Sequence, residues 1–303
     1  MPELQVPPPG RLVDIGGRRL YAQVMGEGSP AVVLEAGFLC TALLWARVAP
    51  ALARFTRVVA YDRAGYGWSD PGPAPRTARA AVADLRALLQ AVGVDGPAVL
   101  AGHSYGGLVA RLYTGLHAAD VAGLVLFDPT DPEQFARLRV NVKAQTRMVV
   151  ALPVLAKVGL LRLLSYLPGV PLLGAVGDLP PRERALVRSL LRLPAQFDTA
   201  LAEWQALPES LRQVRSAPLP RNLALTVVSA GDSARPLPGG LTPAEFRRGM
   251  HQLHAELVAR VPGGQHLIAA GLDHARLPGV SPEGARFAVR VLRTMVEEIR
   301  GGR

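Results

Sequence analysis

The chain has 303 residues, 49% of them apolar, and this composition excludes an intrinsically disordered protein. Its formal net charge is +10, but nearly all of the cations are arginines scattered along the sequence, which argues against a nucleic-acid partner. The single cysteine, Cys40, excludes an intramolecular disulfide, and we interpret it as a small buried hydrophobe.

Targeting segments are not evident. Residues 1–10, MPELQVPPPG, have neither the basic region nor the apolar run of a secretory signal, so we expect a cytoplasmic protein. The most apolar segment, residues 148–176, is interrupted by Lys157, Arg162 and three prolines. About fifteen uncharged residues are left where about twenty are needed, so we expect no membrane span.

The amino-terminal half alternates strand-like and helix-like segments. Residues 11–15 and 18–25 predict a hairpin joined through Gly16 and Gly17, because paired glycines allow the positive φ angles of a two-residue turn. Further predicted strands are 31–37, 56–62, 97–102 and 122–128, and the predicted helices are 45–55, 76–93 and 107–119.

The alternation stops after Asp128. Residues 133–215 have helix-like apolar spacing, repeated prolines and no convincing strand, which indicates a helical insertion. Two more predicted strands, 224–232 and 264–271, and two helices, 243–261 and 284–300, follow it. Continuous apolar strands alternating with helices predict an α/β fold with a parallel sheet covered on both faces.

Residues 102–106, Gly-His-Ser-Tyr-Gly, fit the pattern G-x-S-x-G where a predicted strand gives way to a helix. A sharp turn there brings the backbone too close for a Cβ at the flanking positions, and it strains the serine so that its hydroxyl stands above the carboxyl edge of the sheet. The helix start favours negative charge on a reacting oxygen. We interpret Ser104 as a nucleophile; the alternative is a tight turn whose serine only caps the helix.

The strand, elbow and helix, preceded by residues 61–70, YDRAGYGWSD, and followed by a helical insertion and a late histidine, resemble the α/β-hydrolase superfamily. The resemblance implies an eight-stranded, mostly parallel sheet with a helical cap after the sixth strand, and a triad in the chain order Ser, Asp or Glu, His. On this basis we expect an α/β-hydrolase core of residues 1–130 and 216–303, and a cap of residues 131–215.

A serine hydroxyl is a poor nucleophile until a neighbouring imidazole takes its proton. His274 lies in a loop between the last predicted strand and the closing helix, which is where such a base must sit to reach Ser104. His251 and His254 lie on a helix predicted to be exposed, so we expect them to be solvated, and His266 falls within a strand pattern. We therefore interpret His274 as the base.

Two acids compete to orient His274. Asp128 ends the strand after the elbow helix, and Asp232 ends the next strand along the chain. The resemblance allows either position and more often implies the later one, but Asp232 follows Gly231 immediately, which is an imperfect register. We favour Asp128 and keep Asp232 as the alternative; the other acid is expected to be a structural cap or turn residue.

The resemblance also implies two backbone N–H donors for an oxyanion. One is Tyr105, directly after the serine, and the other is Phe38, in the loop after strand 31–37. We expect residues 62–70 to brace this loop. No metal and no organic cofactor are implied.

Residues 148–176 are too apolar for an exposed loop, so we expect their nonpolar faces to pack over the catalytic edge or on one another. Packing over the edge predicts an apolar pocket and a small hydrophobic acyl substrate. Packing on one another predicts only the core of the cap itself. Shallow association with a membrane surface, assisted by Lys157 and Arg162, is a third interpretation.

Together these features predict a serine hydrolase that cleaves an ester or related acyl bond. Serine at the elbow disfavours the haloalkane dehalogenase and epoxide hydrolase branches, which the resemblance associates with an aspartate nucleophile. Peptidase, thioesterase, lactonase, carbon–carbon hydrolase and cofactor-free haloperoxidase activities stay open. Outside catalysis, a small-ligand receptor and a membrane-surface or partner-binding scaffold are the rivals. No oligomeric state is assigned.

Overall fold

The computed structural model describes residues 9–167, 174–232 and 241–302. Within these residues eight strands form one sheet in the order β1-β2-β4-β3-β5-β6-β7-β8. β2 is antiparallel to β1 and β4, and the strands from β4 to β8 are parallel, which confirms the predicted fold class. The strands are β1 (Gly10–Asp14), β2 (Arg19–Met25), β3 (Val32–Glu35), β4 (Val58–Tyr61), β5 (Ala98–His103), β6 (Val121–Phe127), β7 (Ala224–Ala230) and β8 (Gln265–Ala269).

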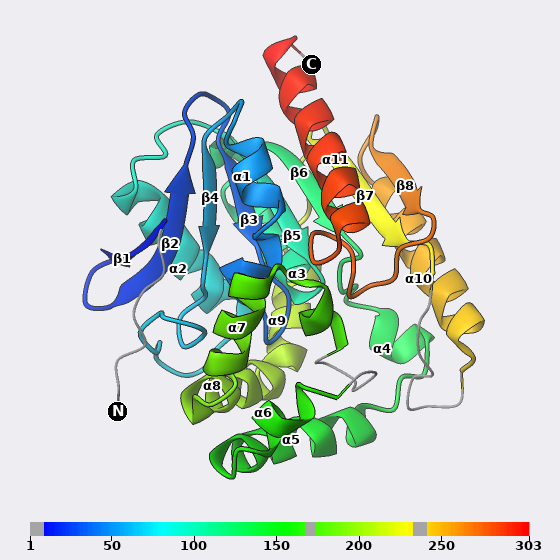
Figure 1. Ribbon diagram of the computed structural model, residues 1–303. Coiled ribbons are helices and arrows are strands. Elements are labelled where there is room, and N and C mark those ends of the chain that lie inside the picture. The colour runs from blue at the N-terminus through cyan, green and yellow to red at the C-terminus, as the bar shows by residue number, and fades with distance from the viewer. Residues whose placement is uncertain (1–8, 168–173, 233–240, 303) are drawn as a thin grey trace.

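Helices cover both faces of the sheet (Figure 1). Side chains alternate along β5, so that Val99 and Ala101 join one apolar cluster and Leu100 joins the other. The helices of the first cluster are α1 (Val48–Leu52) and α11 (Pro282–Arg300), and those of the second are α2 (Ala78–Ala91), α3 (Tyr105–Leu116), α9 (Leu207–Arg215) and α10 (Pro243–Val258). Two cores therefore hold the sheet rigid between them.

A helical segment separates β6 from β7. Its elements are α4 (Gln134–Arg137), α5 (Val142–Lys157), α6 (Leu160–Leu164), η3 (Gly174–Asp178), α7 (Pro181–Leu190), α8 (Pro194–Gln205) and α9; the short helices η1 (Ala42–Trp45) and η2 (Ala118–Asp120) lie elsewhere. No strand occurs in its described part, residues 131–167 and 174–215, as predicted. Figure 1 shows α5 to α8, called the cap helices below, beyond the carboxyl ends of the parallel strands. α9 instead packs with α2 and α3.

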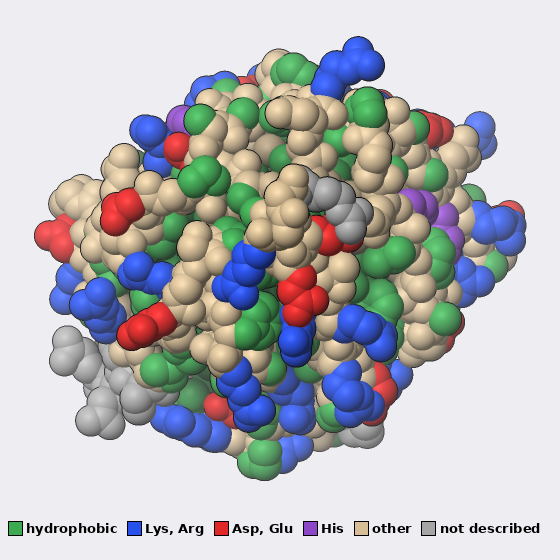
Figure 2. All heavy atoms as spheres, turned by 90° about the horizontal axis from the view of Figure 1, so that it is seen from above, with side chains coloured by type: hydrophobic (Ala, Val, Ile, Leu, Met, Phe, Trp, Pro, Cys, Tyr) green, Lys and Arg blue, Asp and Glu red, His purple; other side chains and the backbone are tan. Residues whose placement is uncertain are grey.

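Surface charge and helix hydropathy bear on the possible partners of the chain. On the face shown in Figure 2, Lys and Arg side chains form several separate groups with acidic side chains among them. In the described ranges, no helix combines the length and the apolar character that crossing a bilayer requires.

A buried ion cluster joins the cap helices to the sheet. The Arg63 guanidinium binds Glu35, at the end of β3, through Nη1 at 2.7 Å, and Glu203, on α8, through Nε at 2.9 Å. All three side chains are only 2% exposed. Hydroxyls of two buried tyrosines complete the cluster: Tyr61 donates to Glu35, and Tyr66 donates to Glu203 at 2.7 Å. The Arg63 guanidinium thus neutralises one carboxylate from the sheet and one from the cap helices.

Removal of this cation is expected to destabilise the protein strongly. Arg63→Met leaves two buried carboxylates without a cation to neutralise them, so the free energy of unfolding should fall by about 3–5 kcal/mol in urea denaturation. The control is Arg293→Met, since Arg293 makes an exposed pair with Glu297 and its loss should change stability by less than about 0.5 kcal/mol. Equal effects of the two substitutions would contradict the structural role of the cluster.

Candidate active site

Ser104 occupies a cramped turn between β5 and α3. Its backbone angles are φ 53° and ψ −121°, a region that residues other than glycine rarely adopt. A Cβ at Gly102 would lie 2.6 Å from the carbonyl oxygen of Gly106, and a Cβ at Gly106 would lie 2.5 Å from that of Ala36. Both glycines are therefore required by close backbone approach, as the G-x-S-x-G pattern predicts.

Three side chains from distant parts of the chain form a hydrogen-bonded series. Ser104 Oγ lies 3.1 Å from His274 Nε2, and His274 Nδ1 lies 2.6 Å from Asp128 Oδ2. With Nδ1 donating to the carboxylate, Nε2 is free to accept the serine proton. The other carboxylate oxygen of Asp128 accepts from the Ala230 N–H at 3.0 Å, which fixes its orientation.

The structure distinguishes the two candidate acids by position. Asp128 directly follows β6 with φ 43°, and its N–H donates to the Val228 carbonyl at 2.6 Å, so its side chain is held at the carboxyl edge of the sheet. Asp232 is exposed and donates its N–H to the Leu272 carbonyl at 3.1 Å. In the described structure His274 contacts Asp128 and makes no hydrogen bond to the Asp232 carboxylate. The preferred acid and the base thus lie together.

The groups around His274 make its imidazole more basic. Desolvation opposes the charged form of His274, but its hydrogen bond to Asp128 and that negative charge raise its pKa. Burial would raise the pKa of Asp128, yet the hydrogen bond with His274 and its charge lower the pKa below the ordinary value. Beneath them, burial lowers the pKa of His103 to about 3, so this stacked ring is neutral and adds no competing charge.

The two expected N–H donors belong to residues next to the elbow and to the loop that passes it. Tyr105 is the first residue of α3, so its N–H lacks an intrahelical acceptor. Phe38 follows Gly37, whose position is so close to the elbow that a Cβ there would lie 3.3 Å from Ser104 Cβ. Arg63 Nη2 donates to the Gly37 carbonyl at 2.9 Å. Since carbonyl and N–H of a trans peptide point in opposite directions, this bond turns the Phe38 N–H away from Arg63.

The expectation that His251 and His254 are solvated is wrong. His254 is fully buried; its Nε2 donates to the Pro129 carbonyl at 2.9 Å, and its Nδ1 lies 2.7 Å from Ser229 Oγ. Ser229 Oγ also lies 2.7 Å from His266 Nε2, and His251 donates to a backbone carbonyl at the end of β7 at 2.8 Å. The bond from His254 to Pro129 supports the backbone directly after Asp128.

A sequence signal for His254 was present. Met250, Leu253 and Leu257 are buried on α10, and His254 lies on the same helical face at spacings of four, one and three residues. Apolar neighbours at these spacings indicate a buried face, so a histidine among them is a candidate for a hydrogen-bonded core residue.

An apolar cavity of about 120 Å³ opens beside Phe38. It lies between the loop after β3 and the cap helices, and its other lining residues are Leu39, Cys40, Thr41, Leu44, Val176, Leu179, Val187, Leu190, Leu191, Gln196, Phe197 and Val280. Burial raises the pKa of Cys40 to about 11, so its half-buried sulfur is a thiol. The cavity suits a small apolar group.

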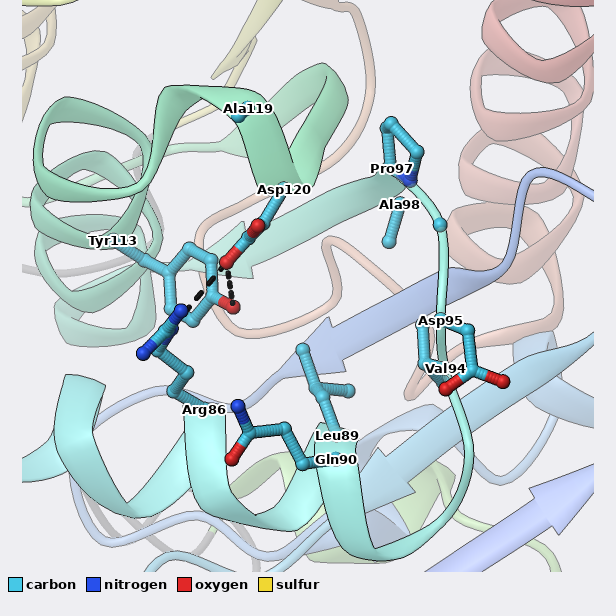
Figure 3. A pocket seen from close by; sticks show the side chains of 11 residues that line it. Arg86, Leu89, Gln90, Val94, Asp95, Pro97, Ala98, Tyr113, Ala119 and Asp120 are labelled. Carbon is cyan, nitrogen blue, oxygen red and sulfur yellow. Dashed lines mark hydrogen bonds and ion pairs between the residues drawn. The ribbon is translucent and has the colours of Figure 1, made fainter.

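A larger pocket of about 280 Å³ lies at the other end of the sheet (Figure 3). Pro97 and Ala98, which line it, stand at the start of β5, whereas Ser104 follows the end of that strand. Its polar wall is built by Asp120, which accepts from Arg86 and from Tyr113. It holds none of the residues that carry the serine site. Among the described residues, no group of three His, Cys, Asp or Glu could bind a metal ion.

A mostly parallel sheet with a strained serine at its carboxyl edge defines the class of α/β hydrolases. Residues 32–280 match the model of the alpha/beta hydrolase family, and the chain belongs to this family. The lipase LipV of Mycobacterium tuberculosis is 40% identical over 126 residues, which are 41% of this chain and 47% of the lipase. A fluoroacetate dehalogenase of a Burkholderia species is 37% identical over 123 residues, 39% of this chain and 40% of the dehalogenase.

Solved structures share the fold over nearly the whole chain. A thermophilic esterase from Thermogutta terrifontis superposes with a TM-score of 0.65 at 19% identity and covers 96% of this chain and 98% of the esterase. Eight curated relatives, in contrast, are matched over only 5% to 47% of their own length. The activities of these relatives are therefore not assigned to this chain.

The pKa of His274 offers a direct test of the contact with Asp128. In the wild type it should exceed the ordinary value of 6.5, and Asp128→Asn should lower it, because the hydrogen bond and the negative charge that favour the imidazolium are both lost. NMR titration of the imidazole, assigned with His274→Gln, measures this difference. Asp232→Asn is the control and should leave the value unchanged; a larger decrease in that variant would assign the contact to Asp232.

Proposed function

We propose that the protein is a serine hydrolase that cleaves an ester or related acyl bond of a small hydrophobic substrate. The observation that supports this best is the series from Ser104 Oγ to His274 at 3.1 Å and from His274 to Asp128 at 2.6 Å, built on a strained elbow. These distances support the roles of nucleophile, base and orienting acid that acyl transfer needs.

In the first half of the reaction, Ser104 Oγ attacks the substrate carbonyl carbon while His274 Nε2 takes the hydroxyl proton. Asp128 keeps the imidazole in the tautomer that accepts this proton and stabilises the imidazolium. Negative charge develops on the carbonyl oxygen, and the N–H groups of Tyr105 and Phe38 are the proposed donors to it. The imidazolium then protonates the leaving alcohol.

In the second half, water attacks the acyl-enzyme. His274 removes a proton from the water, the tetrahedral intermediate forms against the same N–H donors, and its collapse returns the proton to Ser104 Oγ and releases the acid. Since only the neutral imidazole acts as a base, activity is lost as the pH falls through the raised pKa of His274.

The apolar cavity beside Phe38 supports a small acyl group as the substrate portion bound there. Its walls bury nonpolar surface, and the sole titratable side chain in the lining, Cys40, is an uncharged thiol. Phe38 joins the cavity to the elbow, because its ring packs against Tyr105 at 6.4 Å between centroids. In the proposed binding mode the scissile carbonyl lies over Ser104 and the acyl chain extends past Phe38 into the cavity.

Covalent labelling distinguishes this enzyme from a noncatalytic receptor. A fluorophosphonate should phosphonylate Ser104 in the folded wild type, because attack on phosphorus uses the same activated hydroxyl as attack on a carbonyl. Mass spectrometry of the labelled peptide identifies the site. Ser104→Ala is the negative control; an unlabelled wild type that is folded by circular dichroism would favour a receptor.

The choice of acid can be measured in turnover of p-nitrophenyl butyrate. Asp128→Asn should lower kcat by about 10⁴, because an amide favours the wrong imidazole tautomer and stabilises no imidazolium. Asp232→Asn should leave kcat within about twofold. Thermal denaturation checks that both variants fold. Equal, small effects of the two substitutions would show that neither carboxylate has the proposed role.

A further inference from the structure

The exposed apolar side chains of this protein are concentrated on one surface. Eleven large hydrophobic residues are exposed in the described part of the chain, and nine of them lie between residues 142 and 167. We name this surface, with its exposed cations, the α5–α6 face. It comprises Val142, Met148, Val150, Val154, Val158, Leu160, Leu163, Tyr166 and Leu167, together with Lys143, Arg147 and Lys157.

The two faces of α5 have different surroundings. Leu152 and Ala156 are buried and pack against Phe197 of α8 and Leu191. Val154 and Val158, which are 61% and 70% exposed, project from the opposite side. Figure 1 shows α5 and α6 at the outer edge of the cap helices, on the far side from the sheet. The outward valines are therefore not part of the core of the cap.

Cations accompany these exposed apolar residues. Lys143, Arg147, Val150, Val154 and Lys157 follow one another at spacings of four, three, four and three residues, which places them on one side of the helix. The sequence contains no Asp or Glu between Glu133 and Asp178, and both lysines of the chain lie within this stretch. The three cations of the face make no ion pair among the described residues.

Exposed apolar side chains together with nearby cations favour a partner that is negatively charged. A second copy of the chain would bring Lys and Arg against Lys and Arg, with no acidic side chain in the segment to separate them. An anionic lipid surface instead accepts apolar side chains below its headgroups and pairs cations with its phosphates. Tyr166, stacked under Arg188 at 4.3 Å, is amphipathic in the way that the interface favours. We propose that the α5–α6 face docks on the surface of an anionic membrane.

The docking does not depend on the catalytic role of Ser104, so the full-length chain can be tested as Ser104→Ala. Cosedimentation with vesicles of phosphatidylcholine and phosphatidylglycerol should capture the protein, and vesicles of phosphatidylcholine alone should capture much less. Lys143→Gln/Arg147→Gln/Lys157→Gln should weaken capture about a hundredfold, since each cation near an anionic surface contributes about fivefold in affinity.

A matched variant separates a local surface from the general charge of the chain. Arg286→Gln/Arg290→Gln/Arg293→Gln removes the same charge from exposed positions on α11 and should retain capture within about threefold. An equal loss in this variant would overturn the proposal, since net charge alone would then account for binding.

A second pair of variants tests the contribution of the exposed apolar side chains to vesicle binding. Val154→Ser/Val158→Ser should weaken capture at least tenfold, whereas Leu116→Ser/Ile268→Ser, at exposed apolar sites outside this face, should not. Circular dichroism checks that each variant is folded. Absence of capture by anionic vesicles, or a lipid-free dimer that the valine variant dissociates in analytical ultracentrifugation, would overturn the proposal.

Discussion

The position of Arg63 determines how the parts of this molecule meet. Its guanidinium binds the carboxylates of Glu35 and Glu203 and the carbonyls of Ala36 and Gly37, all out of contact with water. A buried cation is stable only with such partners, because desolvation otherwise penalises it. One side chain therefore connects the end of β3, the loop that leads to Phe38, and helix α8. The cavity between loop and cap helices depends on this connection.

Hydrogen bonds also hold the strained backbone at two strand ends. Ser104 and Asp128 both have positive φ, each directly beyond a strand of the sheet. The Ser104 N–H donates to the carbonyl of Phe127 at 3.1 Å, and the Ser104 carbonyl accepts from Thr130 at 3.0 Å. Backbone bonds between neighbouring strand ends thus offset the cost of conformations that an isolated turn would not keep. The His254 bond to Pro129 extends this support to the far side of Asp128.

The sequence predicts features formed by residues that are neighbours in the chain, and it leaves open contacts between residues that are far apart in the chain. The elbow around Ser104 is readable because glycine spacing, strand and helix are adjacent in the chain, and the alternation of elements predicts the sheet. The choice between Asp128 and Asp232 depends on how one backbone turns after its strand, which propensity does not specify. Glu203 is 140 residues from Arg63, and His254 finds Ser229 and Pro129 only after folding. The expectation that the nonpolar faces of residues 148–176 pack over the catalytic edge or on one another fails for the outward side of α5.

Helix α8 stands between that outward surface and the serine. On one side Phe197 packs against α5, and Trp204 Nε1 donates to Thr146 Oγ1 of α5 at 2.9 Å. On the other side the Trp204 ring lies 6.1 Å from that of Phe38. Packed rings therefore connect α5 to Phe38, which is one of the residues that line the cavity. Arg63 binds Glu203 on the same helix, so the buried ion cluster also fixes α8 against the loop that leads to Phe38.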